Sequence, residues 1–147
     1  MRTRLINAVL FVLPVGLFAT FILASSVAAE GRPLSTTLTG AAEVPPADPD
    51  GTGTANITLN QGQGEVCFDL TVANIAPPTR SHIHNAPAGT NGPIVVPFFE
   101  ANNVTLSGCV SADPDLIKDI RQNPENYYVN VHNAEFPGGA IRGQLSK

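Results

Sequence analysis

Apolar and polar residues alternate in short runs along most of the chain. A period of two places successive side chains on opposite faces of a β-strand. The pattern is clearest at 54–59 and 65–72, which are joined by Gln61-Gly62-Gln63-Gly64. Two such runs with a glycine-containing turn between them predict a hairpin. Similar runs predict further strands at 34–38, 81–84, 94–99, 104–110, 127–132 and 140–145.

One segment follows a helical period instead. Asp113 can act as the N-cap, Pro114 suits the first helical position, and apolar residues fall on one side of the segment before Pro124. A short helix is therefore expected near 113–123. Seven or eight short strands at fairly even spacing, together with this helix, predict an all-β domain, an antiparallel Greek-key sandwich or barrel.

The first 29 residues do not fit this pattern. Arg2 and Arg4 precede an almost unbroken apolar run, Leu5 to Ala24, and small residues lead up to Ala29. This order is typical of a secretory signal peptide, and we predict cleavage after Ala29. An uncleaved membrane anchor is the alternative, because about 20 apolar residues can span a bilayer. We expect a signal peptide at 1–29, a flexible stretch at 30–33 and one domain at 34–147.

Export would change what the two cysteines imply. Cys67 and Cys109 form the only possible pair, and a disulfide is the expected state in an oxidising compartment. A thiolate metal site is the alternative, but neither cysteine has C-x-x-C spacing. We expect the protein in the periplasm, at the cell surface or in the extracellular medium, with no membrane span once the signal peptide is removed.

Composition and charge narrow the range of partners. With 147 residues, 43% of them hydrophobic, the chain can build one sizeable core. Its formal net charge is -4 and it has no basic run, so nucleic acid is not expected as a partner. No Ser-His-Asp order, phosphate-binding loop or isolated carboxylate pair indicates an enzyme. We therefore expect binding rather than catalysis.

All three histidines fall in two predicted strands, Ser81 to His84 and Tyr127 to His132. Alternation turns Ile83, Val129 and Val131 toward the core and places on the outer face, toward solvent, His82, His84, Tyr128 and His132. Two histidines at i, i+2 and a third from another strand form a three-nitrogen set suited to copper or zinc. The alternative is that each histidine holds its own loop by hydrogen bonds to backbone carbonyls.

Arg142 and Tyr128 extend this outer patch. Arg142 can attract an anion or the carboxylate of a partner, and a surface salt bridge with Glu135 or Asp69 is the alternative. Tyr128 shares the phase of His132. We therefore predict that Arg142 and Tyr128 contact an anion or a partner beside the histidines.

Three stretches of the chain resemble a known family. They are Leu38 to Pro46 (LTGAAEVPP), His82-Ile83-His84 with Asn91 to Val96 (NGPIVV), and Tyr127 to Leu145 (YYVNVHNAEFPGGAIRGQL). They are similar to the CHRD domain, the module repeated in the developmental protein chordin and found alone in many exported bacterial proteins. The resemblance runs from about Leu34 to the C-terminus, with a departure at Asn85, where many members have Gly. It implies an extracellular β module whose partner is a protein or a matrix component.

A weaker resemblance is to copper-zinc superoxide dismutase, a Greek-key barrel. That family has an H-x-H strand, a late V-H strand that supplies another copper ligand, and a following arginine that guides the anion. The chain has the same order in His82, His84, His132 and Arg142. No further histidine is present to bridge to zinc. The resemblance therefore implies a superoxide-dismutase-like or immunoglobulin-like fold and a copper (or zinc) site, without implying dismutase activity.

Three functions are consistent with the sequence. The first is an exported, non-catalytic CHRD binding module with a transition-metal site on one sheet face, formed by His82, His84 and His132. The second is a copper-binding metalloprotein with a redox or metal-handling role. The third is a purely structural domain of a matrix or surface.

Overall fold

The structure is a computed structural model that describes residues 33–147. The predicted signal peptide, its cleavage site and most of the stretch expected to be flexible lie outside these residues. Among the residues that are described, no helix is both long and apolar enough to cross a membrane.

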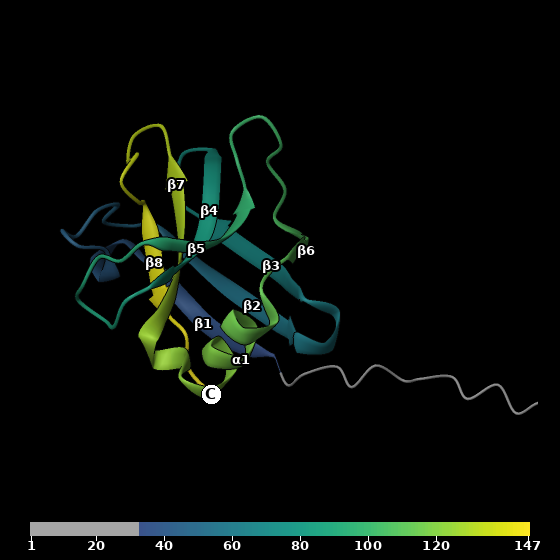
Figure 1. The fold of residues 1–147 in the computed structure, drawn as a ribbon. Coiled ribbons are helices and arrows are strands. Elements are labelled where there is room, and N and C mark those ends of the chain that lie inside the picture. The colour runs from purple at the N-terminus through teal and green to yellow at the C-terminus, as the bar shows by residue number, and fades with distance from the viewer. Residues whose placement is uncertain (1–32) are drawn as a thin grey trace, which may run out of the picture.

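In the part of the chain that the structure describes, eight antiparallel strands form a single sheet in the order β5-β4-β7-β8-β1-β2-β3-β6. The two ends of this order, β5 and β6, lie against each other, so the sheet curls into a nearly closed barrel (Figure 1). The predicted all-β Greek-key fold is confirmed, since β3 lies beside β6 and the chain between them runs through β4 and β5. The strands are β1 (Leu34–Thr39), β2 (Thr52–Asn60), β3 (Glu65–Ala73), β4 (Pro78–Asn85), β5 (Ile94–Phe99), β6 (Ser107–Ser111), β7 (Tyr127–Asn133) and β8 (Ile141–Gln144).

The barrel interior holds the apolar residues of the alternating pattern. In β2 buried and exposed residues alternate, with Ile57 fully buried, and the same phase in β3 buries Val66 and Phe68. The Phe68 ring stacks on Phe98 of β5, with 4.4 Å between ring centroids. A two-residue period was sufficient to identify these inward positions, because one face of each strand packs on the core.

The helix α1 (Pro114–Gln122) closes one end of the barrel (Figure 1). The Asp113 side chain accepts hydrogen bonds from the backbone N–H groups of Asp115, at 2.7 Å, and Leu116, at 3.3 Å, which satisfies two of the free donors at the helix start. Ile117 and Ile120 are fully buried. Short 3-10 turns, η1 (Gly40–Ala42), η2 (Gln61–Gln63) and η3 (Pro124–Asn126), complete the connections.

The two cysteines lie directly opposite each other on β3 and β6 and form a disulfide. The predicted pairing of Cys67 and Cys109 is confirmed. The alternative of a thiolate metal site is wrong, because both sulfur atoms belong to this bond.

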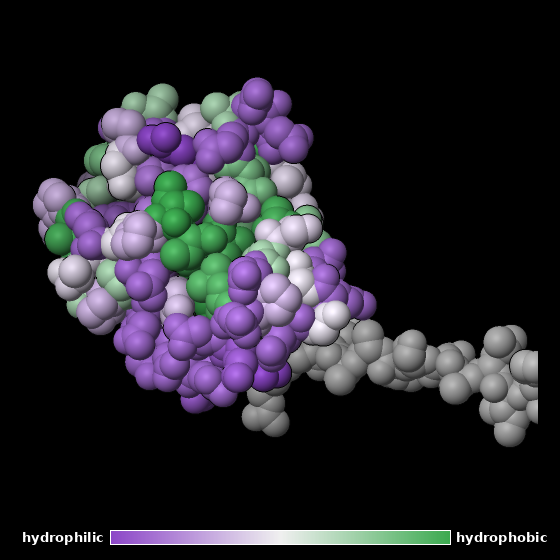
Figure 2. Space-filling view, viewed as in Figure 1, coloured by the Kyte–Doolittle hydropathy of each residue, from purple (hydrophilic) through white to green (hydrophobic). Residues whose placement is uncertain are grey.

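Within residues 33–147 two large apolar side chains are exposed, Ile94 at the start of β5 and Val104 before β6. On the side of the molecule seen in Figure 2, apolar residues gather in the middle, over β5, and hydrophilic residues surround them. The predicted strand at 104–110 begins only at Ser107. Val104 continues the alternation in sequence but lies in the loop before the strand.

Candidate metal centre

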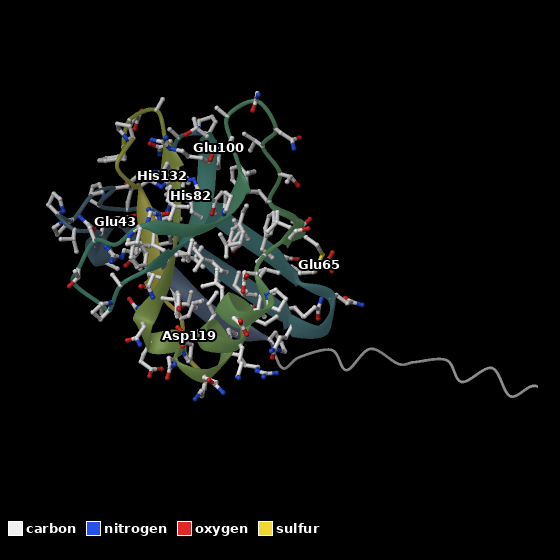
Figure 3. All side chains as sticks on the ribbon, in the orientation of Figure 1. Glu43, Glu65, His82, Glu100, Asp119 and His132 are labelled. Atoms are coloured by element: carbon white, nitrogen blue, oxygen red, sulfur yellow. A yellow bond between two sulfur atoms is a disulfide. The ribbon has the colours of Figure 1, made fainter. Side chains whose placement is uncertain are left out.

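The antiparallel pairing of β4 with β7 brings the histidines together. His82 lies opposite Asn130, His84 opposite Tyr128, and Arg80 opposite His132. Residues directly opposite one another in an antiparallel pair project from the same face. All three imidazoles therefore lie on the outer face of this pair, and Figure 3 shows His82 and His132 next to each other.

The three rings are close enough to share one ligand. Ring centroids lie 5.5 Å apart for His82 and His84, 5.1 Å for His82 and His132, and 6.4 Å for His84 and His132. One nitrogen from each ring lies within 4.8 Å of the other two. A single ion at the usual zinc–nitrogen distance of about 2 Å can be reached from positions this close.

The sequence-based expectation that these side chains face solvent is wrong. His82, His84 and His132 are 1%, 8% and 6% exposed, and Tyr128 and Arg142 are each 2% exposed. The outward phase is as alternation predicts, but loops cover this face. The covering segments are the loop from β1 to β2, the loop from β4 to β5 and the turn from β7 to β8. A hydrogen bond from Asn91 Nδ2 to the Val44 carbonyl, at 2.8 Å, joins the two loops.

Hydrogen bonds to oxygen acceptors set the tautomers of His82 and His132. Nδ1 of His132 lies 3.0 Å from the Pro137 carbonyl, and Nε2 of His82 lies 3.2 Å from the Glu100 carboxylate. Because these oxygens accept, each of these nitrogens carries the proton and donates. The other nitrogen of each neutral ring therefore has a free lone pair. These two atoms, His82 Nδ1 and His132 Nε2, are buried and have no hydrogen-bond partner.

His84 is held in the same manner. Its Nδ1 donates to the Gly92 carbonyl at 2.9 Å, and its Nε2 lies 3.1 Å from the side-chain amide of Asn130. With the proton on Nδ1, the Nε2 lone pair can accept from the Asn130 amide nitrogen after a half-turn of that amide, whose two orientations have the same shape. The His84 ring also stacks on Tyr128, with centroids 4.7 Å apart.

Burial keeps the three imidazoles neutral. Desolvation is the largest cause that lowers the pKa of each ring, and it takes the pKa of His132 to about 4. The hydrogen bonds of these rings to Glu100, Gly92 and Pro137 oppose this effect without overcoming it. The neutral imidazole is the form that ligates metal ions.

The guanidinium group of Arg142 is held by contacts inside the protein. It donates through Nη1 to Asn91 Oδ1, at 2.9 Å, and through Nη2 to the Thr90 carbonyl, and its guanidinium carbon lies 3.4 Å from the centre of the Tyr128 ring. The surface salt bridge considered for Arg142 is wrong, because the side chain is buried. A contact of Arg142 and Tyr128 with an anion or a partner stays a prediction.

Sequence reasoning missed three residues around the histidines, namely Glu43, Asn91 and Glu100. Glu43, in the loop after β1, is 6% exposed and its Oε1 is buried without a hydrogen-bond partner. Desolvation raises the pKa of Glu43 to about 7, although Arg142 and Asn130 act to lower it. Figure 3 shows Glu43 and Glu100 on different sides of the histidines. Glu43 and Asn91 do lie in the stretches that resemble the CHRD domain, which was the one available signal.

The Greek-key barrel with a buried polar layer on its outer side defines a small β module with a candidate metal centre. The sequence model of the CHRD domain matches residues 34–145. The chain therefore belongs to the CHRD domain family, as the sequence motifs predicted. Neither a curated protein nor a solved structure matches the chain.

Proposed function

We propose that this chain is an exported, non-catalytic CHRD module that holds one copper or zinc ion. His82 would ligate through Nδ1, and His84 and His132 through Nε2. The observation that carries the proposal is the close approach of three neutral rings, which place one nitrogen each within 4.8 Å of one another. Two ring nitrogens of this cluster, His82 Nδ1 and His132 Nε2, are buried and have no hydrogen-bond partner. The disulfide and the family membership support export.

The alternative, in which each histidine is held only by hydrogen bonds, accounts for both nitrogens of His84 and for one nitrogen each of His82 and His132. It leaves His82 Nδ1 and His132 Nε2 without a role, and an unpaired buried polar atom costs about 1–3 kcal/mol. The outer bonds, to Glu100, Gly92 and Pro137, are also those that metal-bound histidines usually make to carboxylates and backbone carbonyls. A metal ion accounts for both nitrogens of each ring.

The ligand set favours copper or zinc over other ions. Imidazole nitrogens suit both, whereas calcium and magnesium prefer oxygen ligands. Three protein ligands leave a fourth coordination position for water or another small ligand. The cysteines would not contribute to this choice, since both are in the disulfide.

Calorimetric titration of the metal-free protein with Zn²⁺ and Cu²⁺ tests the proposal. We expect uptake of one ion per chain, weakened by roughly a hundredfold or more in His84→Ala and His132→Ala. Asn126→Ala, an exposed change outside the cluster, is the matched control and should leave the affinity unchanged. A folded wild-type protein that takes up neither ion would rule the proposal out.

A redox or metal-handling role is the second candidate, favoured by the three-histidine set and its open fourth position. Assaying the copper-loaded protein for superoxide disproportionation separates the two. Retention of copper without turnover supports a holding role. Turnover that is lost in His132→Ala would favour the redox role.

A further inference from the structure

A pocket of about 250 Å³ lies beside the histidine cluster, and none of the histidines lines it. Its walls are residues 43–47, from the loop after β1, and residues 135–139, from the turn after β7. The Pro137 carbonyl, which accepts from His132, belongs to one wall. The pocket is therefore a neighbour of the candidate metal centre, with its own lining.

The walls are mainly apolar and the space is small. Val44, Pro45, Pro46, Phe136 and Pro137 supply aliphatic and aromatic surface. Pockets for drug-sized ligands measure about 300–1,000 Å³, so this one suits a short aliphatic group. Prolines and a cis Val44–Pro45 bond shape the first wall.

One polar side-chain atom in the lining lacks a partner. Glu43 is 6% exposed, and its Oε1 atom is buried and has no hydrogen bond. Gly139 lies so close that a Cβ at this position would come within 2.3 Å of Oε1, and its φ of +136° also favours glycine. A glycine at 139 therefore leaves room for the Glu43 carboxyl in the lining.

The charges of the lining favour a cation. Glu43 and the exposed Glu135 are both acidic, and no lysine or arginine is part of the lining. The nearest cation acting on Glu43 is Arg142, but its guanidinium donates to Asn91 and Thr90. Among residues 33–147 the one carboxylate in contact with a basic side chain is that of Glu100, which accepts a hydrogen bond from neutral His82, so Glu43 has no counter-ion within bonding distance.

The geometry favours an ammonium group over a guanidinium group. Only Oε1 of Glu43 is both buried and without a partner, and a guanidinium is best matched by two carboxylate oxygens side by side. An ammonium group is a compact charge that a single oxygen can accept from. Its alkyl chain can pack along apolar walls while its head reaches the acid.

We propose that this pocket binds a primary alkylammonium group, whose carbon chain packs between the prolines and Phe136 and whose N–H donates to Oε1 of Glu43. The group has two sources of the same chemistry, a free alkylamine or the side chain of a lysine in a peptide. The site is separate from the proposed metal centre, so each can be tested without the other.

NMR titration of the metal-free, ¹⁵N-labelled protein with n-butylammonium tests this proposal. Saturable shifts are expected at the amides of Ala47, Gly138 and Gly139, with a Kd on the order of 1 mM for so small a ligand. Butyrate and n-butanol have the same carbon chain without the positive charge and should give no saturable shift at these amides. Equal binding of n-butanol, or no saturable shift with n-butylammonium, would overturn the proposal without bearing on metal uptake.

Two variants locate the ammonium group. Glu43→Gln keeps the shape and removes the charge, and should weaken binding by roughly tenfold or more, while Glu135→Gln at the exposed rim should weaken it by less than about threefold. An added Cβ at Gly138 meets nothing within 4 Å, so Gly138→Leu should fold, narrow the pocket and also weaken binding. Unchanged binding in both Glu43→Gln and Gly138→Leu would place the ligand elsewhere and refute the assignment.

The source is identified by a second pair of probes. Nα-acetyl-lysine amide and Nα-acetyl-norleucine amide differ only in the terminal ammonium group. If the lysine compound binds more tightly than n-butylammonium, the pocket takes a peptide side chain. If n-butylammonium binds and the lysine compound does not, the pocket takes a free amine.

Discussion

The two faces of the β4–β7 pair are both buried, yet they differ in composition and in how well their atoms are satisfied. On the inner face Ile83, Val129 and Val131 are fully buried apolar residues. On the outer face His82 and Asn130 are 1% and 2% exposed. Three of the four buried unpaired side-chain atoms among residues 33–147 lie in this outer layer, on Glu43, His82 and His132. Apolar burial supplies stability, whereas polar burial that is left unsatisfied points to a binding role.

Removing an inner side chain should have the largest effect on this comparison. Ile83→Ala deletes methyl and methylene groups from a fully buried site, and should lower the free energy of unfolding by about 2–5 kcal/mol. Urea denaturation of the metal-free protein measures this change. Metal affinity of the folded fraction should change little, because the side chain points to the other face. A loss below about 1 kcal/mol would show that the inner face is not the stabilising one.

The outer layer should stabilise the protein only when the ion is bound. At a free metal concentration of about 100 times Kd, binding adds about 2.7 kcal/mol to the free energy of unfolding. His82→Ala should abolish this gain. Thermal unfolding with and without Zn²⁺ measures it in both proteins. An equal gain in wild type and His82→Ala would mean that the ion stabilises from another site.

The carboxylate that positions His82 should matter less than the ring itself. The Glu100 side chain is 58% exposed. The substitution Glu100→Gln therefore leaves no unpaired buried charge. We expect metal affinity to fall by about tenfold, the low end of the range for residues that orient ligands. Calorimetry compares this variant with Glu125→Gln, a change at an exposed acid in the turn η3, which packs against α1. Equal affinities would show that Glu100 does not position the ring.

A pH dependence of stability should come from Glu43. Its pKa is about 7 in the folded protein against an ordinary value of 4.5, so the folded state binds the extra proton between these pH values. The contribution of Glu43 to stability is therefore complete below pH 4.5 and is lost as the pH rises toward 7. Glu43→Gln removes this dependence, and its Tm relative to wild type should rise by roughly 5–10 °C from pH 5 to pH 7.5. A constant difference across this range would contradict the assignment.

The sequence predicted the positions that local periodicity determines. Ile57 and Phe68 could be placed in the core because their strands alternate strictly, and Asp113 could be placed at the helix start because capping is a local interaction. The side of the sheet on which the histidines lie followed from the same alternation.

What the sequence could not predict depends on contacts between distant loops. The loop after β4 covers His84 through Gly92, and the turn after β7 covers His132 through Pro137. The alternation within β4 and β7 does not indicate that these two segments fold back over the histidines. Glu43 and Glu100 approach the histidines from separate loops, so their roles follow from strand order, which local alternation does not determine. Val104 was assigned to a strand for the same reason, since alternation alone does not show where pairing begins.

The polar layer draws on residues from Glu43 to Arg142, which span nearly the whole described chain. β4 and β7 are neighbours in the sheet but are separated in sequence by β5, β6 and α1, so neither half of the domain contains the cluster. A nascent or truncated chain that ends before β7 has two of the three imidazoles and no enclosing turn. Metal binding would therefore require the completely folded domain, and a cell could load the ion only into full-length, folded chains.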